Sequence, residues 1–506
     1  MAIRPTFYAF EIARSAIALN QRWLDVTGQN LANVDTPGYS RQRVVQTALG
    51  AGSVHWQYKL HPKYNVGLGV SIDSIQRIRD QFLDRRVRRT NSEASAYLVK
   101  DQALSRVEEI FNPIVFENLE GAMADFKKAL ENLSENADDV SFKALVRAKA
   151  DSLAKLINGM AKELEDVEAD QSDSLALMEN SINQIARSLA SLNREIMAQH
   201  VLGAQHVSNE LLDARDLLLD ELSGFGNITV TEDMNGGVTV KLGDFTLVDP
   251  AQVDPNQVAF YKDPTDPAGT YKFVDANDPA GSAAASAITF TQGSVKGLLD
   301  MVNGFNLYGS ALLPEATDAK GLPFFINMLD NYAQTLATTF NDLNALGDGG
   351  TGLVLFAEAG SNSAANITAR NFSISQAWVD DADAIKTTDG STLGASANDL
   401  TRRMAGIFED KLGFGLYGSF TINEYMRSLI TEIANQVQEN QRMLDYSSAQ
   451  LMAVENQRDM IMAVSLNEEG INMAKFQQSY NAAARYMTAL DEAVDVIVNR
   501  MGIVGR

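Results

Sequence analysis

The chain contains no cysteine among its 506 residues, and this absence excludes several kinds of site. Without thiols it can hold no disulfide, zinc–thiolate site or iron–sulfur cluster. A cysteine-free chain also suits a protein that ends outside the cell without an oxidative folding step. Histidine is scarce too, with four in the whole chain. His200 and His206 do not share a helix face as a metal pair would, so we expect no metal site and no cofactor.

Long hydrophobic runs are also missing. No apolar run approaches the roughly 18 residues needed to cross a bilayer, so we expect no membrane insertion. The N-terminal sequence MAIRPTFYAFEIARSAIAL is interrupted by Glu11 and Arg14, so we expect no cleaved secretory signal. The motifs G-x-S-x-G, G-x-x-x-x-G-K-[ST] and H-E-x-x-H are absent, and nothing else in the sequence indicates an enzyme.

Positive charge is in the minority, because 42 basic residues stand against 65 acidic ones and give a formal net charge of −23. A field of this sign disfavours nucleic acid and anionic membranes as partners. One basic cluster stands out, and we interpret it as a basic helix face that meets acidic helices of its own or a neighbouring subunit. Its members are Arg77, Arg79, Arg85, Arg86, Arg88 and Arg89.

Apolar residues near both ends of the chain recur at alternating spacings of three and four. Such a 3.5-residue repeat is typical of a left-handed coiled coil. One such segment alone could equally be an amphipathic helix in a globular core. Its presence at both ends favours two helices that pack on each other or on neighbours, and we expect an assembly interface there. The residues are Ala9, Ile12, Ala16, Leu19, Trp23 and Val26, and Met473, Phe476, Tyr480, Ala483, Met487, Leu490, Val494, Ile497 and Met501.

The hydrophobic pattern of the middle of the chain changes several times between helical and strand-like periodicity. Residues 75–225 read as long helices, and helical patterns return at 293–345 and 421–465. The segment NITVTEDMNGGVTVKLGDFTLV alternates apolar and polar residues around Asn235, Gly236 and Gly237, which predicts a β-hairpin. Proline-rich and glycine-rich segments follow at 249–281 and 350–395. We expect these insertions to lie on the outside, where 250–281 could be excised.

The fold class predicted from this layout is mainly α. We expect a long-helix bundle whose terminal coiled-coil helices pair at one pole, with β-rich domains inserted at the other pole. The expected parts are an arm and turn at 1–65 that pairs with the C-terminal helix at 464–506, a helical bundle at 66–226 completed by 293–349 and 396–463, a β-rich domain at 227–292, and a second β-rich insertion at 350–395.

A specific stop follows the N-terminal helix in the segment NLANVDTPGYSRQRV. Proline lacks an N–H and glycine tolerates a positive φ, so Pro37 and Gly38 end the helix, and we expect a positive φ at Gly38. We expect the turn to set the angle of the arm and to belong to the assembly interface. Its residues are Asn30, Asn33, Thr36, Pro37, Gly38 and Tyr39.

Residues 18–44 resemble the N-terminal signature of the bacterial flagellar rod, hook and hook-associated proteins, a helix with Asn-x-x-Asn followed by Thr-Pro-Gly-Tyr. Residues 464–502 resemble the C-terminal signature of the same family. Internal segments at 208–222, 293–305 and 332–347 resemble its hook-associated members. The matching C-terminal residues are Glu468, Glu469, Gln477, Tyr480, Ala482 and Ala484.

The resemblance implies a structural subunit that is exported through the flagellar type III apparatus and forms part of the extracellular flagellum. It implies a ring of copies that joins hook to filament, with the hook subunit below, a second junction protein and the filament above, and an export chaperone at the C-terminal helix. A hook or rod subunit is an alternative, although a hook body should be mostly β. A rod-associated peptidoglycan hydrolase would need catalytic residues in the β-rich insertions, where no convincing catalytic pair is found.

Overall fold

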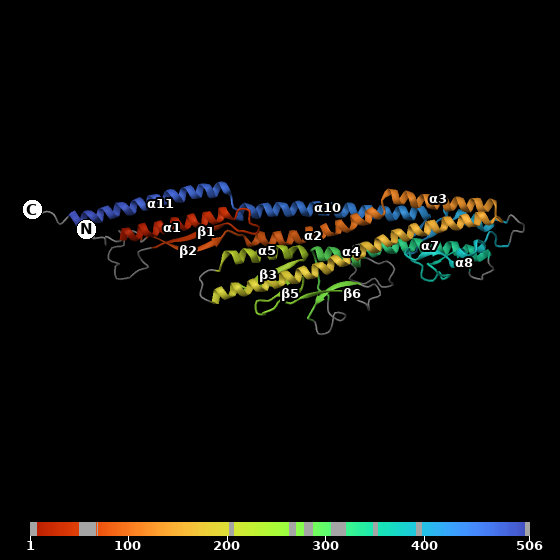
Figure 1. The fold of residues 1–506 in the computed structure, drawn as a ribbon, viewed down its shortest axis with the longest axis horizontal. Coiled ribbons are helices and arrows are strands. Elements are labelled where there is room, and N and C mark those ends of the chain that lie inside the picture. Colours follow the sequence, from red (N-terminus) through yellow and green to blue (C-terminus); the bar gives the residue numbers. More distant parts are fainter. Residues whose placement is uncertain are drawn as a thin grey trace, which may run out of the picture.

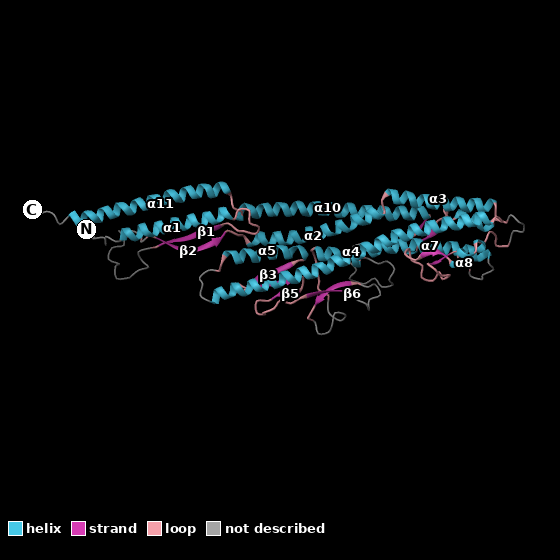
Figure 2. Ribbon diagram, in the orientation of Figure 1, coloured by secondary structure: helices cyan, strands magenta, loops and turns pink. Residues whose placement is uncertain are grey.

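A computed structural model describes residues 8–49, 67, 69–201, 207–262, 270–277, 287–304, 320–347, 353–390 and 397–500. Long helices run side by side along one axis, and both ends of the chain lie at the same pole (Figure 1). Helices dominate, and the strands form small separate sheets (Figure 2). The predicted class, a mainly α fold with inserted β-rich regions, is confirmed.

The arm at the terminal pole consists of the first and last helices and one hairpin. Helix α1 (Tyr8–Ala32) lies beside α11 (Leu466–Asp495), so the predicted pairing of the terminal helices is present (Figure 1). A π-helical segment, η5 (Val496–Arg500), follows α11. Strands β1 (Gln42–Ala48) and β2 (Val70–Arg77) pair antiparallel beside α1, with a bulge between Val45 and Gln46. This hairpin includes residues on both sides of the boundary expected after residue 65.

Five long helices build most of the body. They are α2 (Gln81–Ile110), α3 (Pro113–Glu135), α4 (Val140–Val201), α5 (Asn209–Phe225) and α10 (Ile422–Met462). The starts of α2, α3 and α10 carry capping side chains that accept hydrogen bonds from free backbone N–H groups. Asp80 accepts hydrogen bonds from the first turn of α2, and Thr421 forms a capping box with Glu424 at the start of α10.

The remaining elements fill the side and the far end of the body. The helical ones are α6 (Ser294–Asn303), α7 (Leu322–Gly347), α8 (Gln376–Asp380), η3 (Ala382–Ala384), α9 (Asp399–Gly406) and η4 (Gly415–Tyr417). The strands are β3 (Ile228–Glu232), β4 (Val238–Leu242), β5 (Phe245–Val248), β6 (Val258–Lys262), β7 (Tyr271–Asp275), β8 (Phe356–Glu358), β9 (Phe372–Ile374), β10 (Leu412–Gly413) and β11 (Ser419–Phe420). The predicted hairpin is confirmed, since β3 and β4 pair antiparallel across a turn in which Gly236 has a φ of 78°.

The first β-rich insertion lies along the side of the bundle, a correction to its expected place at the far pole (Figure 1). The reason is visible on α4, whose buried asparagines hold the strands. The amide of Asn183 donates to Val258 O at 2.8 Å and accepts from Val258 N at 2.9 Å. Asn193 makes the same pair of bonds with Val238 at 2.8 and 3.1 Å. A long helix with such side chains docks the sheets beside it.

Two hydrophobic cores stabilise the body, and neither includes a residue of α1 or α11. The larger core joins α3, the first half of α4, α7 and the segment around α8, where Phe126, Phe356 and Trp378 meet edge to face. The second core joins the later half of α4 to α5, α6 and the strands β4 to β7. The body is therefore stabilised independently of the arm. No helix among the described residues is both long and apolar enough to span a membrane.

Candidate functional site

The predicted apolar repeats of α1 and α11 face each other in the arm. Trp23 stacks on Phe476 with ring centroids 4.7 Å apart. Val26 is buried, whereas the rest of the facing set is only half-buried. That half-buried set consists of Ala9, Ile12, Ala16, Leu19, Trp23, Met473, Phe476, Tyr480, Ala483, Met487, Leu490 and Val494.

The seam between α1 and α11 is therefore incomplete in the single chain. Two helices alone cannot enclose their apolar faces, since each leaves the sides of the seam open to water. The repeat also ends before its last predicted members. Ile497 is 48% exposed in the π-helical segment, and Met501 lies outside the described residues. Exposed Leu466, Ile471 and Tyr486 add further apolar surface to α11.

Asn30 fastens the predicted turn to α1. Its side chain is buried, donates to Gln42 O at 3.0 Å and accepts from Gln42 N at 2.9 Å, so it holds the first residue of β1. The hydroxyl of Tyr39 donates to the same amide oxygen at 2.9 Å. Asn33 has a local role, because its amide donates to Gln29 O at 2.9 Å. Asn30, the first asparagine of the Asn-x-x-Asn motif, thus fixes the position of β1 relative to α1.

Gly38 has a positive φ of 78°, as predicted. Residues other than glycine rarely adopt this backbone conformation. A Cβ there would also meet the side chain of Leu217 on α5 at 3.2 Å. Burial, followed by the charge of Asp213, raises the pKa of Tyr39 to about 12, so this hydroxyl stays protonated in all ordinary buffers. The turn therefore rests on α5. Thr36 and Pro37 remain exposed beside it.

Arg41 joins the turn to the start of α11 across the whole length of the sequence. Its guanidinium donates to Glu469 Oε1 at 2.8 Å through Nε and to Glu468 Oε2 at 2.7 Å through Nη1. Its backbone N–H donates to Met462 O at 2.9 Å. Burial lowers the pKa of Arg41, but the two glutamates more than offset this and raise the pKa above its ordinary value. We call Arg41, Glu468 and Glu469 the clasp.

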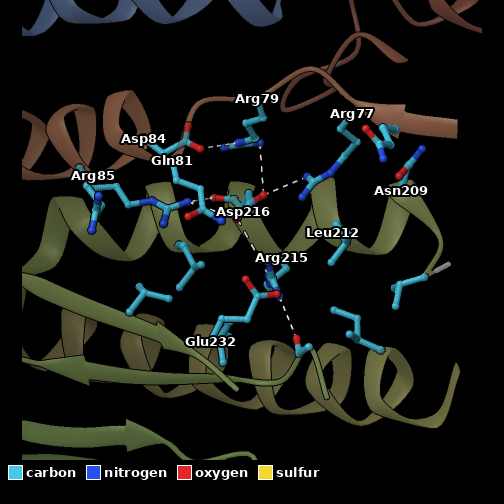
Figure 3. Close-up of a pocket in the computed structure, with 18 of the residues that line it drawn as sticks. Arg77, Arg79, Gln81, Asp84, Arg85, Asn209, Leu212, Arg215, Asp216 and Glu232 are labelled. Carbon is cyan, nitrogen blue, oxygen red and sulfur yellow. Dashed lines mark hydrogen bonds and ion pairs between the residues drawn. The ribbon is translucent and has the colours of Figure 1, made fainter. Parts of the chain in front are cut away.

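Below the turn, α5 presents an acidic stripe to the basic cluster, and Figure 3 shows its middle member, Asp216, beside Arg77 and Arg79. Asp213, Asp216 and Asp220 share one face of α5, because they are spaced by three and four residues. Arg77 contacts the first two, with Nη1 2.7 Å from Asp213 Oδ1 and 2.9 Å from Asp216 Oδ2. Ser40, just after the turn, donates its hydroxyl to Asp213 Oδ1 at 2.7 Å.

Three further arginines complete this network. Arg79 Nη1 lies 3.4 Å from Asp216 Oδ2. Arg88 Nε and Arg458 Nη1 each lie 2.6 Å from an oxygen of Asp220. The network therefore connects the turn, β2, α2, α5 and α10 at the point where the arm meets the body.

Burial determines how much these ion pairs contribute to the stability of the fold. Burial raises the pKa of Asp216, but the charges of Arg79 and Arg77 outweigh it and hold that pKa below its ordinary value. Removing one partner from a buried ion pair leaves an uncompensated charge and costs about 3–5 kcal/mol. The network, which we call the joint, therefore ties the base of the arm to the body.

The predicted meeting of the basic cluster with acidic helices of its own chain is confirmed for Arg77, Arg79 and Arg88. One detail is corrected: Arg77 belongs to β2 and Arg79 precedes α2, so the cluster is not a single helix face. The spacing of the three aspartates in LLDARDLLLDEL could have revealed the acidic stripe. The family signature included Glu468 and Glu469, but nothing in the sequence indicated that they bind Arg41, which is more than 400 positions away.

Two cavities adjoin the joint. The larger, of about 570 Å³, lies between α5, the start of α2 and the turn between β3 and β4, with Arg215 and Glu232 on its wall (Figure 3). The smaller, of about 510 Å³, lies between α1, β1 and α11 beside Trp23 and Phe476. No group of three metal-ligating side chains occurs among the described residues. The side chain of His200 and all of His206 lie outside that part of the chain.

Comparison with known proteins agrees with this architecture. Residues 104–356 match the model of the "Flagellar hook-associated protein FlgK helical domain", and residues 10–39 match that of the "Flagella basal body rod protein". Flagellar hook-associated protein 1 of Bacillus subtilis is 29% identical over 528 aligned residues, which cover 99% of each chain. Its Escherichia coli counterpart is 22% identical over 96% of this chain and 98% of that one. The flagellar hook junction protein FlgK from Burkholderia pseudomallei has the same fold, with a TM-score of 0.60 and 13% identity over 74% of this chain and 99% of that one.

Proposed function

The chain belongs to the flagellar hook-associated protein FlgK family, and on that premise we propose that it is a non-enzymatic structural subunit of the flagellum, located at the junction between hook and filament. The match of the helical domain model covers residues 104–356, and the curated relatives that carry the name hook-associated protein 1 align along nearly the whole chain. The described fold is dominated by long helices, which argues against the alternative of a hook subunit with a mostly β body.

One structural observation carries the assembly part of this proposal. The seam between α1 and α11 leaves twelve apolar residues half-buried, while the body keeps its own closed cores. A surface of this kind gains stability when neighbouring helices cover it, because burial of apolar area is the main driving force of association. We propose that neighbouring subunits supply these helices and that the arm is the element of assembly.

The neighbours and the export route of the subunit are further parts of this proposal. We propose that copies form a ring between the hook subunit below and a second junction protein and the filament above. We also propose export through the flagellar type III apparatus, with an export chaperone that covers the C-terminal helix beforehand. The exposed side chains of Leu466, Ile471 and Tyr486 on α11 support this last point, since such a surface aggregates unless it is protected.

Labelling of isolated flagella tests the proposal directly. An antibody against the chain should mark one narrow band where hook meets filament, and a strain without the gene should build hooks but shed its filament subunits. Complementation with the full chain should restore filaments. Labelling along the entire hook, or normal filaments without the gene, would contradict the proposal.

A further inference from the structure

A basic and apolar surface lies at the elbow between arm and body. On the outer side of α2, Phe82 is 63% exposed. Near it on α10, Met460 is 85% and Ile461 is 42% exposed. Three arginines of the first turns of α2 complete the surface, which we call the elbow patch: Phe82, Arg85, Arg86, Arg89, Met460 and Ile461.

The antiparallel packing of α2 against α10 brings these two segments together. Asn440 donates to Tyr97 O at 3.1 Å, and Arg86 Nη1 lies 3.5 Å from Gln457 Oε1. Because the residue numbers run in opposite directions, the stretch just after Gln457 lies beside the first turn of α2. The apolar side chains of the elbow patch are therefore neighbours, with the arginines continuing along α2.

The arginines of the elbow patch differ from those of the joint in what they contact. Within the described residues, Arg77, Arg79 and Arg88 are engaged by aspartates of α5, whereas Arg85 and Arg89 are exposed and have no ion pair there. Phenylalanine, methionine and arginine side chains are typical of the centres of protein interfaces. In a chain with a net charge of −23, these exposed arginines should attract an acidic protein surface.

The chain itself carries a matching surface on α4. Glu163, Asp166, Asp170 and Asp173 are exposed and recur at spacings of three and four, which places them on one helix face. Leu177 continues the face and is 69% exposed. Of the four carboxylates, only Asp170 has a basic partner among the described residues, the exposed Arg106. We call this the acidic face.

We propose that the elbow patch of one copy binds the acidic face of a second copy. Phe82 and Met460 would lie against Leu177, while Arg85 and Arg89 would pair with the carboxylates, a combination of apolar contact and charge complementarity. This inference rests on the proposed assembly of copies into a ring.

The positions of the two surfaces give the contact its symmetry. The start of α2 lies nearer the terminal pole than the middle of α4 (Figure 1). In the proposed contact each copy uses its elbow patch for one neighbour and its acidic face for another, which makes the contact heterologous. Heterologous contacts generate rings when the rotation closes.

Disulfide cross-linking is a clean test, because the chain has no cysteine of its own. Two full-length variants, Phe82→Cys and Leu177→Cys, are expressed together in a strain that lacks the unmodified gene, and the isolated flagella are oxidised. We expect a dimer band that requires both variants. Met234→Cys, on the fully exposed turn between β3 and β4, replaces Leu177→Cys in the control and should give no dimer with Phe82→Cys.

Charge reversal then separates a specific contact from mere proximity. Arg85→Glu with Arg89→Glu should lower the cross-link yield by about tenfold or more, because like charges then face each other. Adding Asp166→Arg and Asp173→Arg to the Leu177→Cys partner should restore the yield. The matched control, Arg187→Glu with Arg194→Glu, reverses two exposed arginines elsewhere on α4 and should leave the yield unchanged.

Four results would overturn the inference. Dimers of like variants only, or no dimers although the protein lies at the hook–filament junction, would remove this contact while leaving the proposed function intact. Absence of the protein from flagella would remove both. A dimer of unlike variants that survives charge reversal without change would show that proximity, not recognition, produced the link.

Discussion

Buried asparagines recur at the points where one element of this fold holds another. Asn30 holds the start of β1 to α1, Asn183 and Asn193 hold the strands of the first insertion to α4, and Asn341 on α7 binds the backbone of Leu355 and Phe356. An asparagine amide offers a donor and an acceptor with the spacing of a neighbouring strand, so it can satisfy a peptide group that would otherwise be buried without a partner. Each one fixes a position, and each is costly to replace by an apolar residue.

Asp330 is a half-buried carboxylate whose charge should destabilise the protein at neutral pH. Its Oδ1 accepts a hydrogen bond from Ala369 N at 2.7 Å, and burial raises its pKa to about 6, with a further contribution from Glu165. The folded pKa lies above the ordinary value of 3.8, so the neutral form is favoured in the fold. As the pH falls from above 6 towards 4, the folded protein takes up this proton and gains stability.

Asp330→Asn should therefore stabilise the protein at pH 8 by about 1–3 kcal/mol and have little effect at pH 4. The asparagine keeps the acceptor for Ala369 N and removes the charge. Urea unfolding at both pH values measures the difference, and Asp342→Asn, exposed on the same helix, is the control. An equal effect at both pH values would show that the charge of Asp330 is not the cause.

At the scale of elements, the sequence predicted what periodicity and local chemistry determine. The repeats of α1 and α11, the long helices between them, the hairpin at Gly236 and the positive φ of Gly38 were all predicted from a few neighbouring residues. The clasp and the partners of the asparagines could not be predicted, because they join segments that are far apart in sequence. Nothing local in the sequence distinguishes the carboxylates and amides that form these contacts from the others in the chain.

The first insertion shows the same limit. Its proline-rich and acidic texture suggested a peripheral region, and we expected 250–281 to be dispensable. The structure corrects this expectation, since Val258 and Phe273 are fully buried in the core that they share with α4. Excision would open that core and leave the amide of Asn183 without its partner. The amino-acid composition of the insertion indicates that its loops are exposed, but it does not reveal that the strands between them belong to the core.

Phe476→Asp should weaken assembly far more than it weakens the body. Phe476 stacks on Trp23 in a half-buried seam, and a carboxylate there loses this contact but can still reach water. Since neither core contains residues of α11, the main thermal transition should stay in place while the fluorescence of Trp23 shifts towards that of an exposed indole. Motility should be lost. Gln478→Asp adds the same charge at an exposed position of α11 and should retain the Trp23 signal, whereas a large fall in the melting temperature for Phe476→Asp would place the seam in the core.

At the scale of the whole molecule, a body with its own two cores carries an arm held by a buried joint. The body has two cores, the arm has a half-closed seam, and the arginine–aspartate network with the clasp connects them. In the proposed assembly, the joint fixes the direction of the arm and helices of neighbouring subunits cover the seam. Long-range order in an assembly requires such a fixed angle, since small errors at each subunit accumulate along a ring.

Deleting residues 473–506 tests this division, because it removes most of α11 and leaves the clasp glutamates at their place before the cut. We expect a soluble and largely helical monomer whose main melting temperature changes by less than about 3 °C, since the lost helix contributes nothing to either core. The same protein should fail to restore motility, because α1 alone offers half a seam and nucleates poorly without a partner. Calorimetry measures the first property and swarming the second. Normal filaments from the truncated chain would show that α11 is not needed for assembly, and a large loss of thermal stability would show that the body depends on the arm.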